Sequence, residues 1–185
     1  MTSSIPRLEL DDLDPTLAAV LGPRVERLGY LGEFFRCAGH QPHALRAFME
    51  FTEEAKGGLP DRLVELIALT AACRCRNDYE RNQHERLSVR LGFGRDWVEA
   101  VERLEPEEPA LSDIERVVQR YVIDAIDTYG HEGAAHVDEV VARLGSAGAV
   151  AVMMVLGRYV THALIVNSLE LRPPVPSIFQ DGFNG

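Results

Sequence analysis

The sequence has few cysteines, no surplus of positive charge and no long hydrophobic run. These features argue against a disulfide framework, nucleic-acid binding and a membrane span, respectively. Only three cysteines, Cys37, Cys73 and Cys75, occur among 185 residues. An odd count this low does not build a disulfide framework, and residues 1–12 lack the basic start and apolar core of a secretory signal. We therefore expect a cytoplasmic protein in a reducing compartment.

The charge is acidic, with 29 Asp and Glu against 19 Lys and Arg and a formal net charge of −10. Nucleic-acid binding draws most of its affinity from Lys and Arg that neutralise phosphates, so we expect no nucleic-acid partner. The same charge disfavours an anionic membrane surface. The longest strongly apolar run, residues 147–157, is shorter than the roughly 20 residues of a membrane span. The composition leaves small-molecule chemistry open.

The chain shows helical periodicity nearly throughout and no convincing strand-like alternation, which predicts an all-α fold. We expect a polar N-terminal arm at 1–13, one helical domain at 14–171 and a Pro-rich tail at 172–185. The predicted helices cover residues 14–21, 24–38, 42–56, 61–76, 78–91, 95–104, 112–129, 132–144 and 146–170. Gly22 with Pro23 predicts a helix break, and Ser112 with Glu115 predicts a capping box.

Residues 63–73, LVELIALTAAC, carry a single charge, that of Glu65. At about 100° per residue their apolar side chains cover nearly the whole circumference, so this helix should be buried on all sides. A buried carboxylate must be paired, hydrogen-bonded or protonated. Glu65 is therefore either one half of a structural salt bridge or a functional carboxylate.

The stretch NDYE at 77–80 predicts a helix start, with Asn77 as the N-cap and Glu80 three residues later. Glu80 and His84 are then neighbours one turn apart on the same helix face. A carboxylate and an imidazole in this relation can share a proton, which general acid–base chemistry requires. The alternative is a surface ion pair on a polar helix.

Neither the cysteines nor the histidines show a strong redox or metal pattern. Cys73 and Cys75 lie two residues apart on a predicted helix, about 200° around its axis, where they cannot readily pair. His131 and His136 in HEGAAH are spaced i, i+5, about 140° apart, which does not match the zinc motif H-E-x-x-H. We predict no metal site and no cofactor.

Arg158 and His162 lie four residues apart in an otherwise apolar segment near the C-terminus. His162 is interpreted as a core histidine with its hydrogen bonds satisfied. Arg158 is a candidate counter-ion for a buried acid.

The stretch LPDRLVELIALTAACRCRNDYERNQHERLSVRLGF at 59–93, with NSLELRPPVPSIF at 167–179, resembles the carboxymuconolactone decarboxylase family, which includes the alkylhydroperoxidase D proteins. The family pattern is a Glu, eleven residues, C-x-x-C, three residues and a His. Glu65 and His84 stand at the Glu and His positions. Asn77 and Glu80 stand where the redox members carry their two cysteines, so the redox pair is lacking.

The resemblance implies an alkylhydroperoxidase D-like helical fold that forms homotrimers or hexamers, with active sites near subunit contacts. It suggests an acid–base enzyme that decarboxylates, isomerises or hydrolyses a small oxygenated or carboxylated substrate. In that hypothesis Glu65 orients or protonates His84, His84 moves the proton and Glu80 is the partner acid. Tyr79 and Asn77 would hydrogen-bond the substrate.

Two alternatives remain open. One is a thiol peroxidase that uses Cys73 or Cys75, with Arg74 and Arg76 lowering the thiol pKa. The other is a non-catalytic oligomeric binding protein on the same fold, in which Glu65 is salt-bridged and ionised at every working pH.

Overall fold

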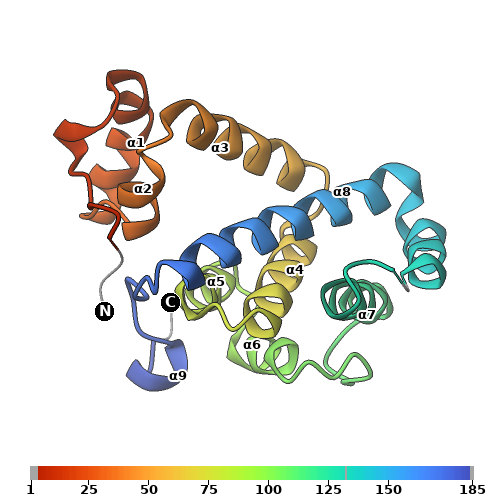
Figure 1. Cartoon of the computed structure of the whole chain (residues 1–185). Coiled ribbons are helices and arrows are strands. Elements are labelled where there is room, and N and C mark those ends of the chain that lie inside the picture. The colour runs from red at the N-terminus through yellow and green to blue at the C-terminus, as the bar shows by residue number, and fades with distance from the viewer. Residues whose placement is uncertain (1–3, 132, 184–185) are drawn as a thin grey trace.

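The computed structural model describes residues 4–131 and 133–183, and within these ranges it contains helices and no β-strand, which confirms the all-α prediction (Figure 1). The predicted arm, the predicted helix 132–144 and the predicted tail include residues 1–3, 132 and 184–185, which lie outside the described residues. The elements are η1 (Leu10–Asp12), α1 (Pro15–Leu28), α2 (Glu33–Ala38), α3 (Pro42–Gly57), α4 (Asp61–Arg74), α5 (Asp78–Arg90), α6 (Arg95–Glu102), α7 (Asp113–Asp127), α8 (Ala134–Ser168) and α9 (Ile178–Asp181).

Helix α4 lies at the centre of the fold because its sequence is apolar on every side. Every residue from Leu63 to Ala72 is buried, and the helix contacts α5, α6, α7 and α8. Figure 1 shows the long helix α8 crossing over α4. Glu65 is 3% exposed, so the prediction of a carboxylate inside an all-round buried helix is confirmed.

The predicted break at Gly22 and Pro23 is wrong, because α1 continues through both residues to Leu28. Proline removes one helical hydrogen bond and crowds the preceding turn, but α1 accommodates it. The helix ends instead at Gly29, whose φ of 78° suits a left-handed C-cap that most residues avoid. Helix α2 begins only at Glu33, so the predicted helix 24–38 is divided between α1 and α2.

Two predicted helix starts are confirmed by side-chain contacts. Ser112 and Glu115 form the capping box that begins α7. Asn77 Oδ1 accepts a 3.2 Å hydrogen bond from the Glu80 backbone N–H at the start of α5. The second contact fixes where α5 begins and therefore where Glu80 and His84 project.

Helix α8 joins the two helices predicted at 132–144 and 146–170. Its φ and ψ at Gly145, 69° and 174°, mark a kink where the sequence predicted the break. By length and composition alone, α8 is the helix among the described residues that could cross a membrane. Of its most apolar stretch of 18 residues, 28% is buried inside the protein. Core helices pass the same test, and α8 packs on α3, α4 and α7.

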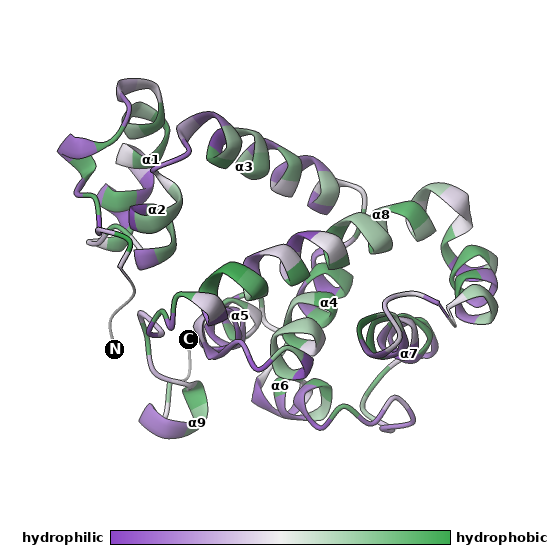
Figure 2. Cartoon of the chain, in the orientation of Figure 1, coloured by the Kyte–Doolittle hydropathy of each residue, from purple (hydrophilic) through white to green (hydrophobic). Residues whose placement is uncertain are grey.

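Two hydrophobic clusters organise the interior. The larger joins α4, α6, α7 and α8, and the smaller joins η1, α1 and α2 to Tyr79 of α5 and Val166 of α8. Figure 2 shows that α3, which leads from the smaller cluster toward α8, carries both hydrophilic and hydrophobic residues around its turns. The boundary between the two clusters is where the candidate site lies.

The C-terminal tail packs on its own chain. Ile178 is fully buried in the larger cluster, and its N–H donates a 2.7 Å hydrogen bond to Glu85 Oε2. Asn82 Nδ2 donates to the carbonyl oxygen of Val175 at 2.9 Å. The tail therefore covers part of α5.

Candidate active site

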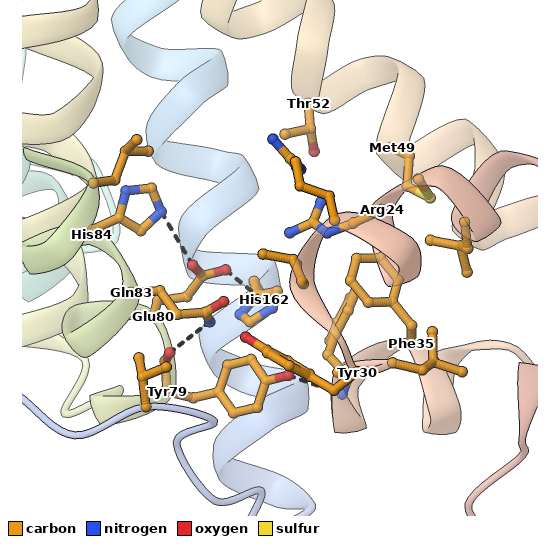
Figure 3. A pocket seen from close by; sticks show the side chains of 18 of the residues that line it. Arg24, Tyr30, Phe35, Met49, Thr52, Tyr79, Glu80, Gln83, His84 and His162 are labelled. Atoms are coloured by element: carbon orange, nitrogen blue, oxygen red, sulfur yellow. Dashed lines mark hydrogen bonds and ion pairs between the residues drawn. The ribbon is translucent and has the colours of Figure 1, made fainter. Parts of the chain in front are cut away.

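A cavity of about 560 Å³ lies between α1–α3 on one side and α5 and α8 on the other (Figure 3). Its lining combines aromatic rings with cationic side chains. The cationic residues are Arg24, Arg27, Lys56, Arg86, Arg90 and Arg158, against the acidic residues Glu53 and Glu80. A protein with a net charge of −10 thus surrounds this cavity with positive charge, which favours an anionic ligand.

His84 lies in the cavity wall with both ring nitrogens occupied. Nδ1 is 2.8 Å from Glu65 Oε2, and Nε2 is 3.2 Å from Glu80 Oε2. The Tyr159 hydroxyl is also 3.2 Å from Nε2, and Ser88 Oγ donates to Glu65 Oε2 at 3.3 Å. Both carboxylates are buried, and Glu65 lies behind His84 outside the cavity lining. The structure thus places the two predicted acids on opposite sides of one imidazole.

Glu80 links His84 to a second group of charges. Its Oε1 accepts a 2.8 Å hydrogen bond from Arg158 Nη1 and lies 3.1 Å from His162 Nε2. Thr52 Oγ1 accepts from Arg158 Nε at 3.4 Å. Figure 3 shows Glu80 between the two histidines, with His84 on α5 and His162 on α8. Arg158 is therefore the predicted counter-ion, and the buried acid that it pairs with is Glu80.

The surroundings give the two histidines opposite charge states near neutral pH. Burial lowers the pKa of His84, but Glu65 and Glu80 outweigh burial and raise that pKa to about 9. Burial lowers the pKa of His162 to about 4, with Arg158 adding to the effect against Glu80. Burial raises the pKa of Glu80, but the Arg158 guanidinium and the hydrogen-bonded His84 imidazolium hold it well below the usual range. His84 is therefore an imidazolium between carboxylates, and His162 is neutral.

The two predicted substrate contacts differ in their placement. Tyr79 lines the cavity, and its hydroxyl accepts a 3.4 Å hydrogen bond from the Phe34 N–H. Asn77 is buried outside the cavity lining and caps α5. Substrate binding through Tyr79 stays a prediction, whereas the structure gives Asn77 a structural task.

Cys73 and Cys75 lie at the end of α4 and do not line the cavity. Burial raises the pKa of Cys73 to about 12, with Glu102 adding to the rise. Burial also raises the pKa of Cys75, although Arg74 opposes it. Arg74 instead pairs with Asp127 at 2.6 Å. The low thiol pKa that the peroxidase alternative requires is therefore not found at Cys73 or Cys75, although Arg74 acts in the predicted direction on Cys75.

The start of α8 lies between His131 and His136. His131 precedes the helix, and His136 lies in its first turn, with Nε2 at 2.5 Å from Asp124 Oδ2 of α7. Within residues 4–131 and 133–183, no group of three or more His, Cys, Asp or Glu side chains is arranged to hold a metal ion.

Three residues of the hydrogen-bond network around His84 and Arg158 were missed in the sequence: Tyr159, Ser88 and Thr52. A tyrosine in an apolar helix is an ordinary core residue, so Tyr159 gives no signal. Ser88 follows His84 by four residues, which places it one turn away on the same face and could have marked it. Thr52 comes from α3, and only the folded chain brings it to Arg158.

Residues 42–105 match the model of the carboxymuconolactone decarboxylase family. The matched residues include Glu65, Glu80 and His84. The resemblance seen in the sequence is therefore confirmed for the segment that contains these three candidate catalytic residues. No curated protein matches the chain significantly.

Solved structures share the fold over most of the chain. A Cys-to-Ala variant of the debrominase Bmp8 in complex with 2,3,4-tribromopyrrole is 17% identical, with a TM-score of 0.78 over 93% of this chain and 92% of that one. An uncharacterised peroxidase-related protein from Ralstonia eutropha JMP134, with an alkylhydroperoxidase AhpD core, is 15% identical, with a TM-score of 0.81 over 94% and 93%. ATU0492 from Agrobacterium tumefaciens, a protein of unknown function, is 21% identical, with a TM-score of 0.67 over 75% and 96%. The carboxymuconolactone decarboxylase segment thus lies within an alkylhydroperoxidase D-like fold.

Proposed function

We propose that the protein is a cofactor-free acid–base enzyme that decarboxylates, isomerises or hydrolyses a small carboxylated organic compound. The observation that carries the proposal is His84 held between Glu65 and Glu80 in the wall of a cationic cavity. Pairs of buried titratable groups with pKa values moved apart are typical of acid–base sites. A purely structural histidine has no need of two carboxylates at the edge of a cavity.

His84 is the proton carrier in this mechanism. In the resting state its Nε2–H points to Glu80 and Tyr159, and its Nδ1–H donates to Glu65. Loss of CO2 or opening of a lactone leaves negative charge on the substrate, and the imidazolium supplies the proton. Glu65 keeps the ring oriented during the transfer, and Glu80 stabilises the proton before it leaves.

The charge and size of the cavity define the substrate class. Arg24 and Arg158 line it together with other cations, so a carboxylate on the substrate has counter-charges within the site. The aromatic side chains Phe34, Phe48 and Tyr79 offer a surface for an apolar ring. The complex of Bmp8 with a tribrominated pyrrole supports the idea that this fold can hold a small ring compound.

We also propose that the chain forms a homo-oligomer, a trimer or a hexamer. Val150, Met154 and Leu164 of α8 are 49%, 48% and 66% exposed. At about 100° per residue they lie within roughly 80° of one another, which makes one apolar stripe along the helix. Such a stripe is typical of a subunit contact. Light scattering after gel filtration tests this directly, and a monomer at micromolar concentration would contradict it.

A cysteine-free variant tests the acid–base proposal against the thiol peroxidase alternative. We expect Cys37→Ser, Cys73→Ser and Cys75→Ser combined to retain turnover of a carboxylated substrate to within about twofold, because the thiols lie outside the cavity and burial raises their pKa values. The measurement is substrate loss by NMR over a panel of small carboxylated lactones and oxo acids.

Peroxide consumption by the same two proteins supplies the control. We expect wild type and the cysteine-free variant to consume hydrogen peroxide equally slowly in the presence of a dithiol. Peroxide consumption that disappears with the cysteines would establish the peroxidase alternative. Binding of panel compounds with no turnover by either protein would favour the non-catalytic alternative.

A further inference from the structure

Lys56 is the single lysine of the chain, since the other eighteen of its 19 basic residues are arginines. It lies in the last turn of α3, and its side chain lines the cavity. A guanidinium stays protonated at any working pH, whereas a lysine amine can lose its proton and then act as a nucleophile. The one residue with this capacity therefore lies in the candidate active site.

Lys56 and His84 both line the cavity and both lie against the ring of Tyr159. Its Nζ is 5.9 Å from the centre of the Tyr159 ring, and the His84 ring packs edge-on against the same ring at 5.2 Å between centres. The Arg158 guanidinium lies 4.4 Å from that ring centre. Within the described residues the Lys56 amine makes no hydrogen bond and no ion pair, so no carboxylate is in direct contact with it.

The electrostatics lower the pKa of the Lys56 amine and so make its neutral form more accessible than that of an exposed lysine. Burial lowers the pKa of Lys56, and the positive charge of Arg158 adds to the effect. Glu53, Glu65 and Glu80 oppose it without reversing it. Glu65 and Glu80 already neutralise His84 and Arg158, which limits what they offer a further cation.

We propose that Lys56 is a catalytic nucleophile that forms an imine with the carbonyl carbon of a small oxo acid bound in the cavity. The inference deepens the proposed function by naming the substrate as an oxo acid and by adding a covalent step. The carboxylate of the oxo acid matches the arginines of the lining, and its carbonyl is the group that an amine attacks. Arginine residues could hold such an acid but could not form the imine.

The step balances without an external oxidant or reductant. The neutral Lys56 nitrogen bonds to the carbonyl carbon and loses a proton as the carbonyl oxygen gains one, giving a carbinolamine. The His84 imidazolium then protonates the hydroxyl, water leaves and the carbon–nitrogen double bond forms as an iminium. In a 3-oxo acid the iminium accepts the electron pair released with CO2. His84 regains a proton from solvent and passes it to the enamine carbon, and hydrolysis by water then releases the product and restores the amine.

Reductive trapping on the native protein tests the proposal. Acetoacetate or phenylpyruvate is added at pH 7 with sodium cyanoborohydride, and the product is examined by intact mass and by peptide mapping. We expect a mass increase located at Lys56 and equal to the oxo acid less one oxygen atom for phenylpyruvate, and to the same or to that less CO2 for acetoacetate. Both adducts should be lost completely in Lys56→Arg. The N-terminal amine is an internal standard, because its ordinary pKa is about 8.

Trapping after unfolding in urea shows whether labelling of Lys56 depends on the folded cavity or only on the presence of one lysine. Unfolded Lys56 regains an ordinary pKa of about 10.4, so labelling should shift from Lys56 to the N-terminal amine. Labelling of the native protein only at the N-terminus, or equal labelling of Lys56 before and after unfolding, would overturn the inference. Turnover of the panel without a Lys56 adduct would overturn it while leaving the proposed function intact. An adduct at Lys56 without turnover of any panel compound would show a reactive amine but would overturn both its catalytic role and the proposed function.

Discussion

Replacing His84 by glutamine is expected to lower kcat for a panel substrate by about 10²–10⁴-fold, the range that a general acid or base contributes. The variant keeps a polar side chain of similar size between Glu65 and Glu80 but cannot carry a proton. KM should change much less than kcat, because the arginines of the cavity lining still bind the carboxylate. Steady-state kinetics with NMR or spectrophotometric detection measures both constants.

Glu65→Gln tests the same proton transfer by changing the carboxylate that contacts His84 from outside the cavity lining. The amide oxygen can still accept from His84 Nδ1–H, so the ring orientation is kept while the negative charge is removed. We expect kcat to fall about 10²-fold, the lower end of the same range. Glu54→Gln, an exposed residue of α3 outside the cavity lining, makes the same charge change and should leave kcat unaltered.

Full turnover by folded His84→Gln and Glu65→Gln variants would contradict the proposal that His84 carries the proton. Circular dichroism and urea unfolding establish that each variant is folded before its kinetics are interpreted.

Arg158→Met is expected to lower the free energy of unfolding by about 3 kcal/mol. Removing one partner of a buried ion pair costs about 3–5 kcal/mol, because it leaves the other charge unpaired. Glu80 is 5% exposed and accepts from Arg158 at 2.8 Å. The lower end of the range applies, because Glu80 keeps the His84 imidazolium as a partner. Urea unfolding at pH 7 measures the change.

Arg46→Met provides the matched control. Arg46 lies 3.8 Å from Glu50, and both side chains are exposed, so this pair should contribute about 0–1 kcal/mol. Equal losses of stability in the two variants would contradict the account of Glu80 as a buried ionised carboxylate that depends on Arg158.

The residues of the site that the sequence revealed are those whose environment is set locally. Glu65 stands out because ten apolar or uncharged neighbours surround it on one helix. Glu80 and His84 stand out because Asn77 fixes where their helix begins and they lie one turn apart. Helix periodicity and capping decide these features within a few residues, so the sequence alone shows them.

Contacts between distant segments could not be predicted in the same way. Arg158 could be recognised as a counter-ion, but its partner Glu80 lies on another helix and is chosen by how α5 and α8 pack. Tyr159 has the appearance of a core residue until α8 brings its hydroxyl to His84. Helix α1 ends at Gly29, which adopts a left-handed conformation, and not at Pro23. Both residues are strong helix breakers in the sequence, so the sequence alone does not decide between them.

The charge of His84 is the central claim, and NMR titration of its imidazole tests it most directly. The account predicts that His84 remains protonated through neutral pH and titrates with a pKa of about 9, because Glu65 and Glu80 outweigh the effect of burial. In Glu65→Gln the titration should move to lower pH, since one of the two carboxylates no longer carries charge. A wild-type titration at or below the ordinary value of about 6.5 would contradict the account, because His84 would then have no proton to donate at neutral pH.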